Sequence, residues 1–296
     1  MAKRKWIEPI YEYTFHLKPT FVVRTSRNIA QHSSFSNSSS FTTGIKQENE
    51  TKGIMSPEAI KKLKSAILWL VYSAEWKKFW HEADQRFYNY QLTFVTLTLP
   101  TQNEKTDQEV KAMMNGFLMS AKYAFGLKNY CWRAEPQRRG TAHIHLTADC
   151  FMHWKKLRYL WNRQLKKADL MNGHSNPNST DIHSLKSVAN IVGYLIKYYT
   201  KQVGERRAMN GRLWGCSHAL TQARHLKVSG IESDGHALQK ELLPQLIYEE
   251  QKDFFTMYNM KNEWFKHIPE GVIKKAMRET MEGIRYTKTT QEIDLL

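Results

Sequence analysis

Apolar and polar residues alternate one by one through several short segments in the middle of the chain. In residues 92–99, apolar Val95 and Leu97 alternate with Thr96 and Thr98. A two-residue period is typical of a β-strand, whose side chains point to opposite faces in turn. The same pattern predicts three further strands, over residues 130–135, 141–148 and 180–185.

Helical periodicity separates these strands. Ser56 followed by Pro57 has the form of an N-cap with proline at the first helical position, which predicts a helix from Ser56 to about Arg86. Further helices are predicted over residues 107–125, 153–167 and 186–202. From residue 92 onward the order is β-α-β-β-α-β-α. This order predicts an α+β fold with a central antiparallel sheet and helices packed on it, of the split-βαβ, ferredoxin-like kind.

The two ends of the chain have a different character. Residues 26–53 are rich in Ser, Thr, Asn and Gly, which is typical of a loop or linker. From Leu238 onward the pattern is helical, so we expect extra helices at both ends. The predicted parts are an N-terminal extension (1–85), a core (86–205), and a basic connector with a helical C-terminal region (206–296).

The chain of 296 residues carries a formal net charge of +16 and is 41% hydrophobic. That hydrophobic content is enough for a packed core. The charge favours a polyanionic partner, with nucleic acid first because Lys and Arg bind phosphates; lysines that only maintain solubility are the alternative. The cysteines show no Cys-x-x-Cys spacing, and the longest apolar run, residues 66–72, is too short to span a bilayer. We therefore expect a cytoplasmic protein without a membrane partner.

Two histidines lie on the polar face of the strand predicted over residues 141–148. His143 and His145 are two residues apart, so both project from one side of the sheet. Glu135 ends the preceding strand, and a hairpin would place it beside the two imidazoles. Two nitrogens and a carboxylate suit Mg²⁺ or Mn²⁺ acting as a Lewis acid. Histidines that are only hydrogen-bonded at the surface are the alternative.

The helix predicted over residues 186–202 carries three tyrosines on two different stripes. At about 100° per residue, the predicted core stripe consists of Val188, Val192, Leu195 and Tyr199. A second stripe, roughly opposite, consists of Tyr194, Lys197, Tyr198 and Lys201. Tyr199 is therefore predicted to pack in the core, and Tyr194 and Tyr198 to be exposed. A solvated face of amphipathic side chains is the alternative for the second stripe.

Three segments occur in an order and spacing that resemble a known superfamily. They are Phe94-Val-Thr-Leu-Thr-Leu-Pro100, the His143-Ile-His145 pair preceded by Glu135, and Tyr194-x-x-Lys197-Tyr198-x-x-Lys201. Together they resemble the motifs of the HUH endonucleases, specifically the two-tyrosine rolling-circle replication initiators of small circular phage, virus or plasmid DNA. Asn210-Gly-Arg-Leu-Trp-Gly215 resembles a segment that often follows the tyrosine helix in such initiators. The resemblance covers about residues 90–215.

The resemblance implies an HUH nuclease core that nicks and joins single-stranded DNA. Tyr194 would attack a scissile phosphate, which leaves a 5′-phosphotyrosine link and a free 3′-OH primer. Tyr198 would be the second nucleophile, and Lys197 or Lys201 would stabilise charge or position the DNA backbone. The divalent metal, Mg²⁺ or Mn²⁺, would be held by Glu135, His143 and His145.

Basic side chains next to these motifs are candidates for binding DNA. In and before the helix predicted over residues 153–167 they are Lys155, Lys156, Arg158, Arg163, Lys166 and Lys167, with Arg138 and Arg139. A solvated helix surface is the alternative for them. No Gly-x-x-x-x-Gly-Lys phosphate loop is present in the sequence, so a fused helicase is not expected. The implied partners are single-stranded DNA, an origin hairpin, and a host helicase and polymerase in the bacterial cytoplasm.

Other functions compete with a replication initiator. A relaxase or a single-strand DNA transposase shares the same sheet chemistry, but relaxases often carry their tyrosine before the histidines, and most such transposases have one catalytic tyrosine. The order of histidines before a tyrosine pair therefore favours an initiator. A non-catalytic protein that binds single-stranded nucleic acid through aromatic residues on its sheet is the alternative outside the enzymes.

Overall fold

The computed structural model describes residues 10–29, 54–81, 84–100, 105–137, 140–185, 190–201, 208–223, 226–252 and 254–268. These residues group into two compact units. One consists of the middle of the chain (49–221) with residues 284–296, and the other combines residues 1–48 with residues 222–283. This division differs from the three consecutive parts expected from the sequence, because the two ends of the chain contribute to one unit.

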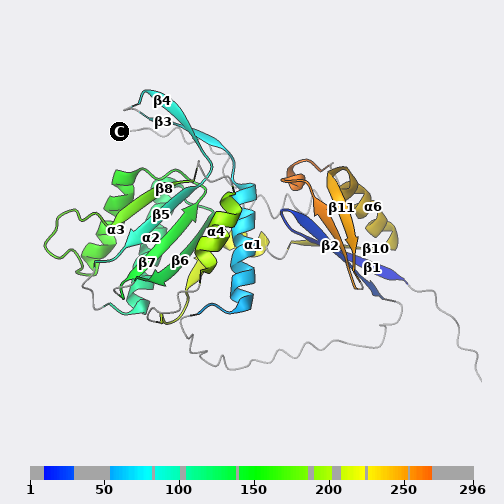
Figure 1. The fold of residues 1–296 in the computed structure, drawn as a ribbon, viewed down its shortest axis with the longest axis horizontal. Coiled ribbons are helices and arrows are strands. Elements are labelled where there is room, and N and C mark those ends of the chain that lie inside the picture. Colours follow the sequence, from blue (N-terminus) through cyan, green and yellow to red (C-terminus); the bar gives the residue numbers. More distant parts are fainter. Residues whose placement is uncertain are drawn as a thin grey trace, which may run out of the picture. The chain divides into compact units, whose positions relative to one another are not determined.

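The middle unit is built on a five-stranded sheet (Figure 1). Its strands are β5 (Thr93–Thr98), β6 (Tyr130–Pro136), β7 (Ala142–Ala148), β8 (Thr180–Ser184) and β9 (Trp214–Cys216). The spatial order is β8-β5-β7-β6-β9, and every neighbouring pair is antiparallel. The first four strands therefore have the order 4-1-3-2 of a split βαβ fold. The predicted α+β class and antiparallel sheet are confirmed.

Five helices accompany this sheet: α1 (Pro57–Ser73), α2 (Asp107–Phe125), α3 (Trp154–Lys167), α4 (Ile191–Thr200) and α5 (His218–Ala223). Local sequence sets where the longest begins and ends. Thr106 and Glu109 form a capping box at the start of α2, and Gly126 ends it in the left-handed conformation with φ of 63°. Within the described chain, no helix is long and apolar enough to cross a membrane.

The helices cover both faces of the sheet. The connections β5-α2-β6 and β7-α3-β8 both join parallel strands, so the usual right-handed crossover places α2 and α3 on the same face. They pack on each other there, with the Phe117 and Trp161 rings 5.9 Å apart. The opposite face is covered by α4, whose tyrosines contact Phe94, and α1 packs beside α4 (Figure 1).

The alternation predicted for the central strands decides what each face carries. Val95, Leu97, Ile144 and Leu146 are buried on one face. On the other face Thr96 is paired with His145, and Thr98 with His143. Because side chains of directly paired residues lie on the same side, both histidines lie on the face that α4 covers.

A hairpin follows α1, where the sequence predicted a longer helix. The helix ends at Ser73, and Lys77–His81 (β3) pairs with Arg86–Tyr90 (β4). The prediction of a helix as far as Arg86 is therefore wrong. Bulky aromatic residues favour a pleated strand, and here Phe79 is paired with Tyr88, their rings 5.7 Å apart.

The second unit draws its strands from both ends of the chain. Its elements are β1 (Tyr11–Leu17), β2 (Phe21–Asn28), β10 (Lys227–Ile231), α6 (Glu232–Leu242), η1 (Leu243–Gln245), β11 (Leu246–Gln251), β12 (Thr256–Met260) and η2 (Trp264–Lys266). The sheet has the order β10-β1-β2-β12-β11. Arg24 of β2 is paired with Thr256 of β12, and its Nη2 donates to the Thr256 hydroxyl at 3.0 Å.

Two sequence predictions for the ends are corrected by this unit. The helix predicted from Leu238 onward does not continue beyond Leu242, because Pro244 lies in a 3₁₀ turn and strands β11 and β12 follow. The loop predicted over residues 26–53 begins later, because β2 continues to Asn28. Residues 30–53 lie outside the described residues.

Tyr199 anchors α4 to the sheet. Its side chain is 0% exposed, as the core stripe predicts, together with Leu195 of the same stripe. The hydroxyl donates to the Cys131 carbonyl at 3.0 Å and is 2.8 Å from the Thr147 hydroxyl. Val188 of the predicted stripe lies outside the described residues, because α4 begins at Ile191.

We predict that Tyr199 contributes to stability through both its ring and its hydroxyl. Tyr199→Phe should lower the free energy of unfolding by about 1–2 kcal/mol, because it removes buried hydrogen bonds. Tyr199→Ala should lower it by about 3–5 kcal/mol, because it also leaves a cavity. Urea denaturation measures both values. Tyr194→Phe, at a more exposed position, is the matched control and should change it by less than about 0.5 kcal/mol.

Candidate active site on the sheet face

His145 is held in a fixed orientation at the centre of the sheet face. Its Nε2 is 3.1 Å from Oε1 of Glu135, and its Nδ1 is 3.2 Å from the Thr96 hydroxyl. The Phe94 ring lies parallel to the imidazole at a centroid distance of 5.8 Å. His145 is 2% exposed, so packing and polar contacts together fix the plane of its ring.

His143 lies beside this pair with its ring turned differently. It is directly paired with Glu135 on β6 and with Thr98 on β5. Its Nε2 is 3.3 Å from the Thr98 hydroxyl, and its ring is edge-on to His145 at a centroid distance of 5.9 Å. All three predicted metal ligands therefore lie on one face, but only Glu135 and His145 are in direct contact.

The described residues contain no group of three or more His, Cys, Asp or Glu side chains arranged to hold a metal ion. The Glu135–His145 pair nevertheless fits a shared ion. Two ligands at right angles, each about 2.1 Å from one ion, lie about 3 Å apart, close to the 3.1 Å observed. The contact of His145 Nδ1 with Thr96 has the form of the outer contacts that orient metal-binding histidines. A third ligand from His143 requires its ring to turn away from Thr98.

Two tyrosines of α4 lie directly over this face. The Tyr198 ring is edge-on to His145 at a centroid distance of 4.8 Å and to Phe94 at 5.3 Å. Tyr194 stacks on Tyr198 with their centroids 5.8 Å apart, and it is 37% exposed. The helix therefore presents one tyrosine against the imidazole and another at the surface, one turn away.

The pKa of the Tyr198 hydroxyl is raised above its ordinary value. Burial is the largest cause, because it disfavours the charged phenolate. The negative charge of Glu135 adds to the effect, and Tyr194 contributes further. A positive charge beside Glu135 would oppose both electrostatic contributions.

The two predicted lysines lie on the tyrosine side of α4. Lys197 and Lys201 are both exposed, and Lys201 is the residue that ends the helix. Its carbonyl accepts a hydrogen bond from Nη2 of Arg133 at 3.1 Å. The last turn of α4 is thereby tied to the middle of β6.

Arg133 is a polar residue of this face to which the sequence pattern gave no role. It is paired with His145, is 4% exposed, and its Nη1 is 2.8 Å from the Met55 sulfur. Burial lowers the pKa of its guanidinium, and Glu135 acts in the opposite direction. Its alternation with Glu135 on one strand was the available signal.

The edge strand β8 adds two further polar residues that the sequence pattern did not single out. Asp181 is paired with Thr96, and His183 with Phe94, so both lie on the same face as His145. His183 Nε2 is 3.0 Å from Asp181 Oδ2. The alternation of Asp181 and His183 with Ile182 carries the signal for this placement.

The predicted DNA-binding residues are not gathered beside the tyrosines. Lys155, Lys156, Arg163, Lys166 and Lys167 are exposed on α3, which lies on the opposite face of the sheet. Arg158 is half-buried and donates from Nη2 to Asn178 Oδ1 at 2.6 Å, while Arg163 Nη2 donates to the Ser120 hydroxyl at 2.7 Å. Arg138 and Arg139 lie outside the described residues.

We predict that Glu135→Gln lowers the pKa of Tyr198. Removing the nearby negative charge favours the phenolate, while burial remains and keeps the pKa above its ordinary value. NMR titration of protein with ¹³Cζ-labelled tyrosine, assigned with Tyr198→Phe, measures the change. Glu58→Gln, at an exposed position of α1, is the control. An unchanged or higher pKa in Glu135→Gln would contradict the coupling.

Comparison with known proteins places the matched segment around this face. A family model for replication-associated proteins of the ORF2 type matches residues 92–203. That segment contains β5, β6, β7, β8 and α4, and with them all three predicted metal ligands and the tyrosines. No curated protein sequence and no solved structure matches the chain. Residues 92–203 are thus similar to replication-associated proteins, and the β3–β4 hairpin lies before the match.

Proposed function

We propose that this protein is a rolling-circle replication initiator that nicks and joins single-stranded DNA through a phosphotyrosine intermediate. One observation carries the proposal: the Tyr198 ring is 4.8 Å from the His145 ring, whose Nε2 is 3.1 Å from Glu135. A phenol over a His/carboxylate pair is suited to attack on a phosphodiester. The family match, to replication-associated proteins, supports replication as the setting.

In the proposed reaction Tyr194 acts first because it is the more exposed of the pair. Its phenol oxygen bonds to the scissile phosphorus as the bond to the 3′ oxygen breaks, and the phenol proton passes through solvent to the leaving oxygen. The products are a 5′-phosphotyrosine and a 3′-OH primer. Attack on that link by a 3′-OH reverses the exchange and joins two ends. Tyr198 is the second nucleophile.

The remaining residues of the face bind and orient. Glu135, His143 and His145 would hold Mg²⁺ or Mn²⁺, which when bound supplies Lewis-acid polarisation of the phosphate. Thr96 fixes the His145 ring through Nδ1, so that Nε2 faces Glu135. Lys197 and Lys201 place positive charge on the exposed side of α4, where a phosphate can be neutralised.

The proposed partner is single-stranded DNA next to an origin hairpin, in the cytoplasm of a bacterial host. The net charge of +16 supports a phosphate-dominated mode of binding. The exposed lysines of α3 would bind the DNA backbone away from the site of cutting, together with Arg138 and Arg139. A host helicase and polymerase would act on the nicked origin.

The competing functions receive less support. The family match favours replication over a relaxase or a transposase. A non-catalytic binding sheet needs exposed aromatic rings on its face, whereas Phe94 is 1% exposed beneath the tyrosines.

We predict metal-dependent cleavage that requires His145. His145→Ala should lower the rate of cleavage of single-stranded origin DNA by at least about 100-fold, because loss of a residue that merely orients a metal ligand already costs about 10–100-fold. DNA affinity should change little, because backbone contacts dominate it. Gel assays of cleavage and anisotropy measurements of binding separate the two effects.

The control for this experiment is His174→Ala, at an exposed turn. It should cleave normally with added Mg²⁺ or Mn²⁺. Undiminished wild-type cleavage in excess chelator would contradict a metal-assisted reaction.

We also predict that the covalent link forms on Tyr194. Tyr194→Phe should remove the primary protein–DNA adduct, because it deletes only the nucleophilic oxygen. Tyr198→Phe should keep the first cleavage and impair a second cut or strand transfer. Mass spectrometry of the trapped adduct locates the modified residue, with Tyr123→Phe, at a highly exposed position of α2, as the control. An adduct on Tyr199, or on Tyr198 alone, would overturn these roles.

A further inference from the structure

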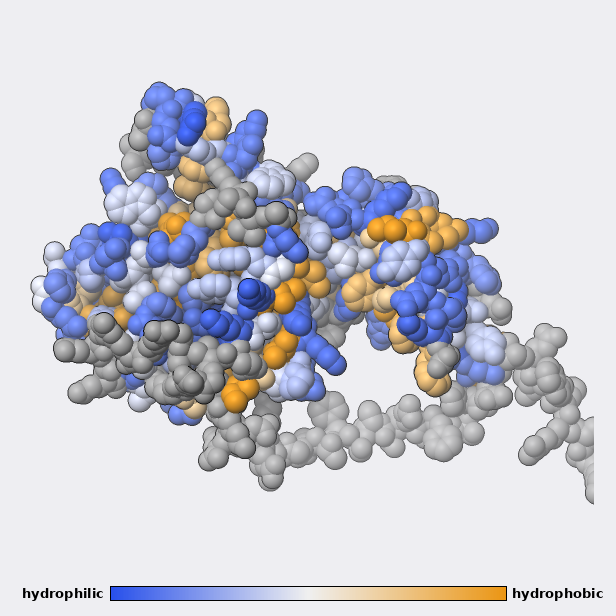
Figure 2. Space-filling view, in the orientation of Figure 1, coloured by the Kyte–Doolittle hydropathy of each residue, from blue (hydrophilic) through white to orange (hydrophobic). Residues whose placement is uncertain are grey.

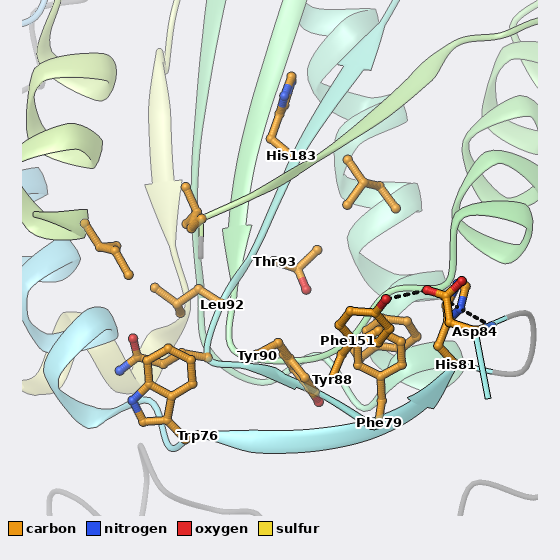
Figure 3. Close-up of a pocket in the computed structure, with 14 residues that line it drawn as sticks. Trp76, Phe79, His81, Asp84, Tyr88, Tyr90, Leu92, Thr93, Phe151 and His183 are labelled. Atoms are coloured by element: carbon orange, nitrogen blue, oxygen red, sulfur yellow. Dashed lines mark hydrogen bonds and ion pairs between the residues drawn. The ribbon is translucent and has the colours of Figure 1, made fainter. Parts of the chain in front are cut away.

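A pocket lies between the β3–β4 hairpin and the edge of the catalytic sheet (Figure 3). Its volume is about 340 Å³, within the size range of small-ligand sites. Its walls come from the hairpin and the segments flanking it, from Phe151, and from strand β8 with the first residue of α4. The hairpin precedes the segment matched by the family model, so the match assigns this pocket no role.

Aromatic rings form one side of the pocket and hold each other in place. Phe79 stacks on Phe151 with their centroids 4.2 Å apart, and on Tyr88 at 5.7 Å. Tyr90 contacts Phe151 at 5.6 Å, and Trp76 is 63% exposed at another side of the pocket (Figure 3). In Figure 2 the hairpin, at the top of the view, shows pale orange hydrophobic atoms among blue hydrophilic ones. Fixed, partly exposed rings are the surfaces on which unpaired bases stack.

The far end of the pocket is polar. Asp84 accepts a hydrogen bond from the Tyr88 hydroxyl, and its Oδ2 is 3.2 Å from His81 Nδ1 and 3.9 Å from Arg86. These neighbours offset the negative charge of Asp84, which therefore repels a polyanion less. Carboxylate and imidazole groups can accept and donate hydrogen bonds to the edge of a base. Lys78 and Arg86 add exposed positive charge along the hairpin.

The pocket adjoins the tyrosines. His183 lines it, and its ring is 5.7 Å from Phe94, which in turn is 5.3 Å from Tyr198. Ile191 also lines it and begins α4, three residues before Tyr194 and seven before Tyr198. Residues with this spacing lie on one side of a helix. A DNA strand held at the tyrosines therefore passes the mouth of the pocket.

We propose that this pocket binds one unpaired nucleobase of the single-stranded DNA, close to the nucleotide that is cut. The base would stack against the aromatic wall and direct its polar edge toward Asp84 and His81. The choice of ligand rests on the proposed function. The pocket would give the enzyme a base-dependent part of its affinity, which phosphate contacts on α3 do not provide.

Fluorescence anisotropy of the full-length protein in excess chelator tests this proposal without cleavage. The probes are a labelled twenty-nucleotide thymidine oligomer and an abasic sugar-phosphate oligomer of the same length. Trp76→Ala and Phe79→Ala should each weaken binding of the thymidine oligomer about fivefold or more and leave abasic binding unchanged. Phe87→Ala, 65% exposed on the same hairpin but outside the pocket, is the matched control and should bind both as wild type does.

Each result decides the proposal. Equal losses on both oligomers, no loss in either pocket variant, or an equal loss in Phe87→Ala would overturn it, the last because the whole hairpin surface would then bind. Trp76→Ala guards against a folding defect, because its side chain is mostly exposed, and circular dichroism checks both variants. Base-dependent binding without any tyrosine adduct would contradict the proposed nicking reaction and leave the pocket standing. Nicking without base dependence would do the reverse.

Discussion

The register between β5, β7 and β6 is the constraint on which the candidate site depends. It aligns Thr96, His145 and Arg133 in one row across the sheet, and Thr98, His143 and Glu135 in the next. A shift of any strand by one residue would send its polar side chains to the apolar face. The buried apolar side chains at alternate positions, such as Val95 and Ile144, prevent that shift because exposing them would cost hydrophobic free energy.

Much of this arrangement can be predicted from the sequence, because it depends on local periods. Strict alternation gives the strands that carry Glu135 and the histidines, and helical angles separate the buried Tyr199 from Tyr194 and Tyr198. The same reasoning fails where neighbours far along the chain decide the outcome. The aromatic residues of β3 and β4 continue a helical pattern in sequence, but the contact between Phe79 and Phe151 stabilises a hairpin instead. Likewise, the direction in which the His143 ring turns depends on Thr98 of another strand.

The second unit was the least predictable part, because its sheet joins the two ends of the chain. Arg24 and Thr256 meet in neighbouring strands although the whole middle unit lies between them in sequence. No local pattern can reveal a pairing of that kind, and polar-rich stretches such as residues 26–53 conceal it further. The middle unit is thus an insertion within the outer one. Pairings across so long a loop carry a high closure entropy and form slowly.

The contrast between Tyr198 and Tyr199 has a consequence for how many DNA ends the protein can hold at once. The two phenols are adjacent in sequence, yet the hydroxyl of Tyr199 is engaged by Cys131 and Thr147 inside the fold. Burial also raises its pKa well above the ordinary value, so it does not supply a phenolate. Under the proposed chemistry the helix therefore offers two covalent attachment points, although it carries three tyrosines. A capacity of two is what an exchange between an outgoing and an incoming strand requires, and a third site would leave a DNA end stranded.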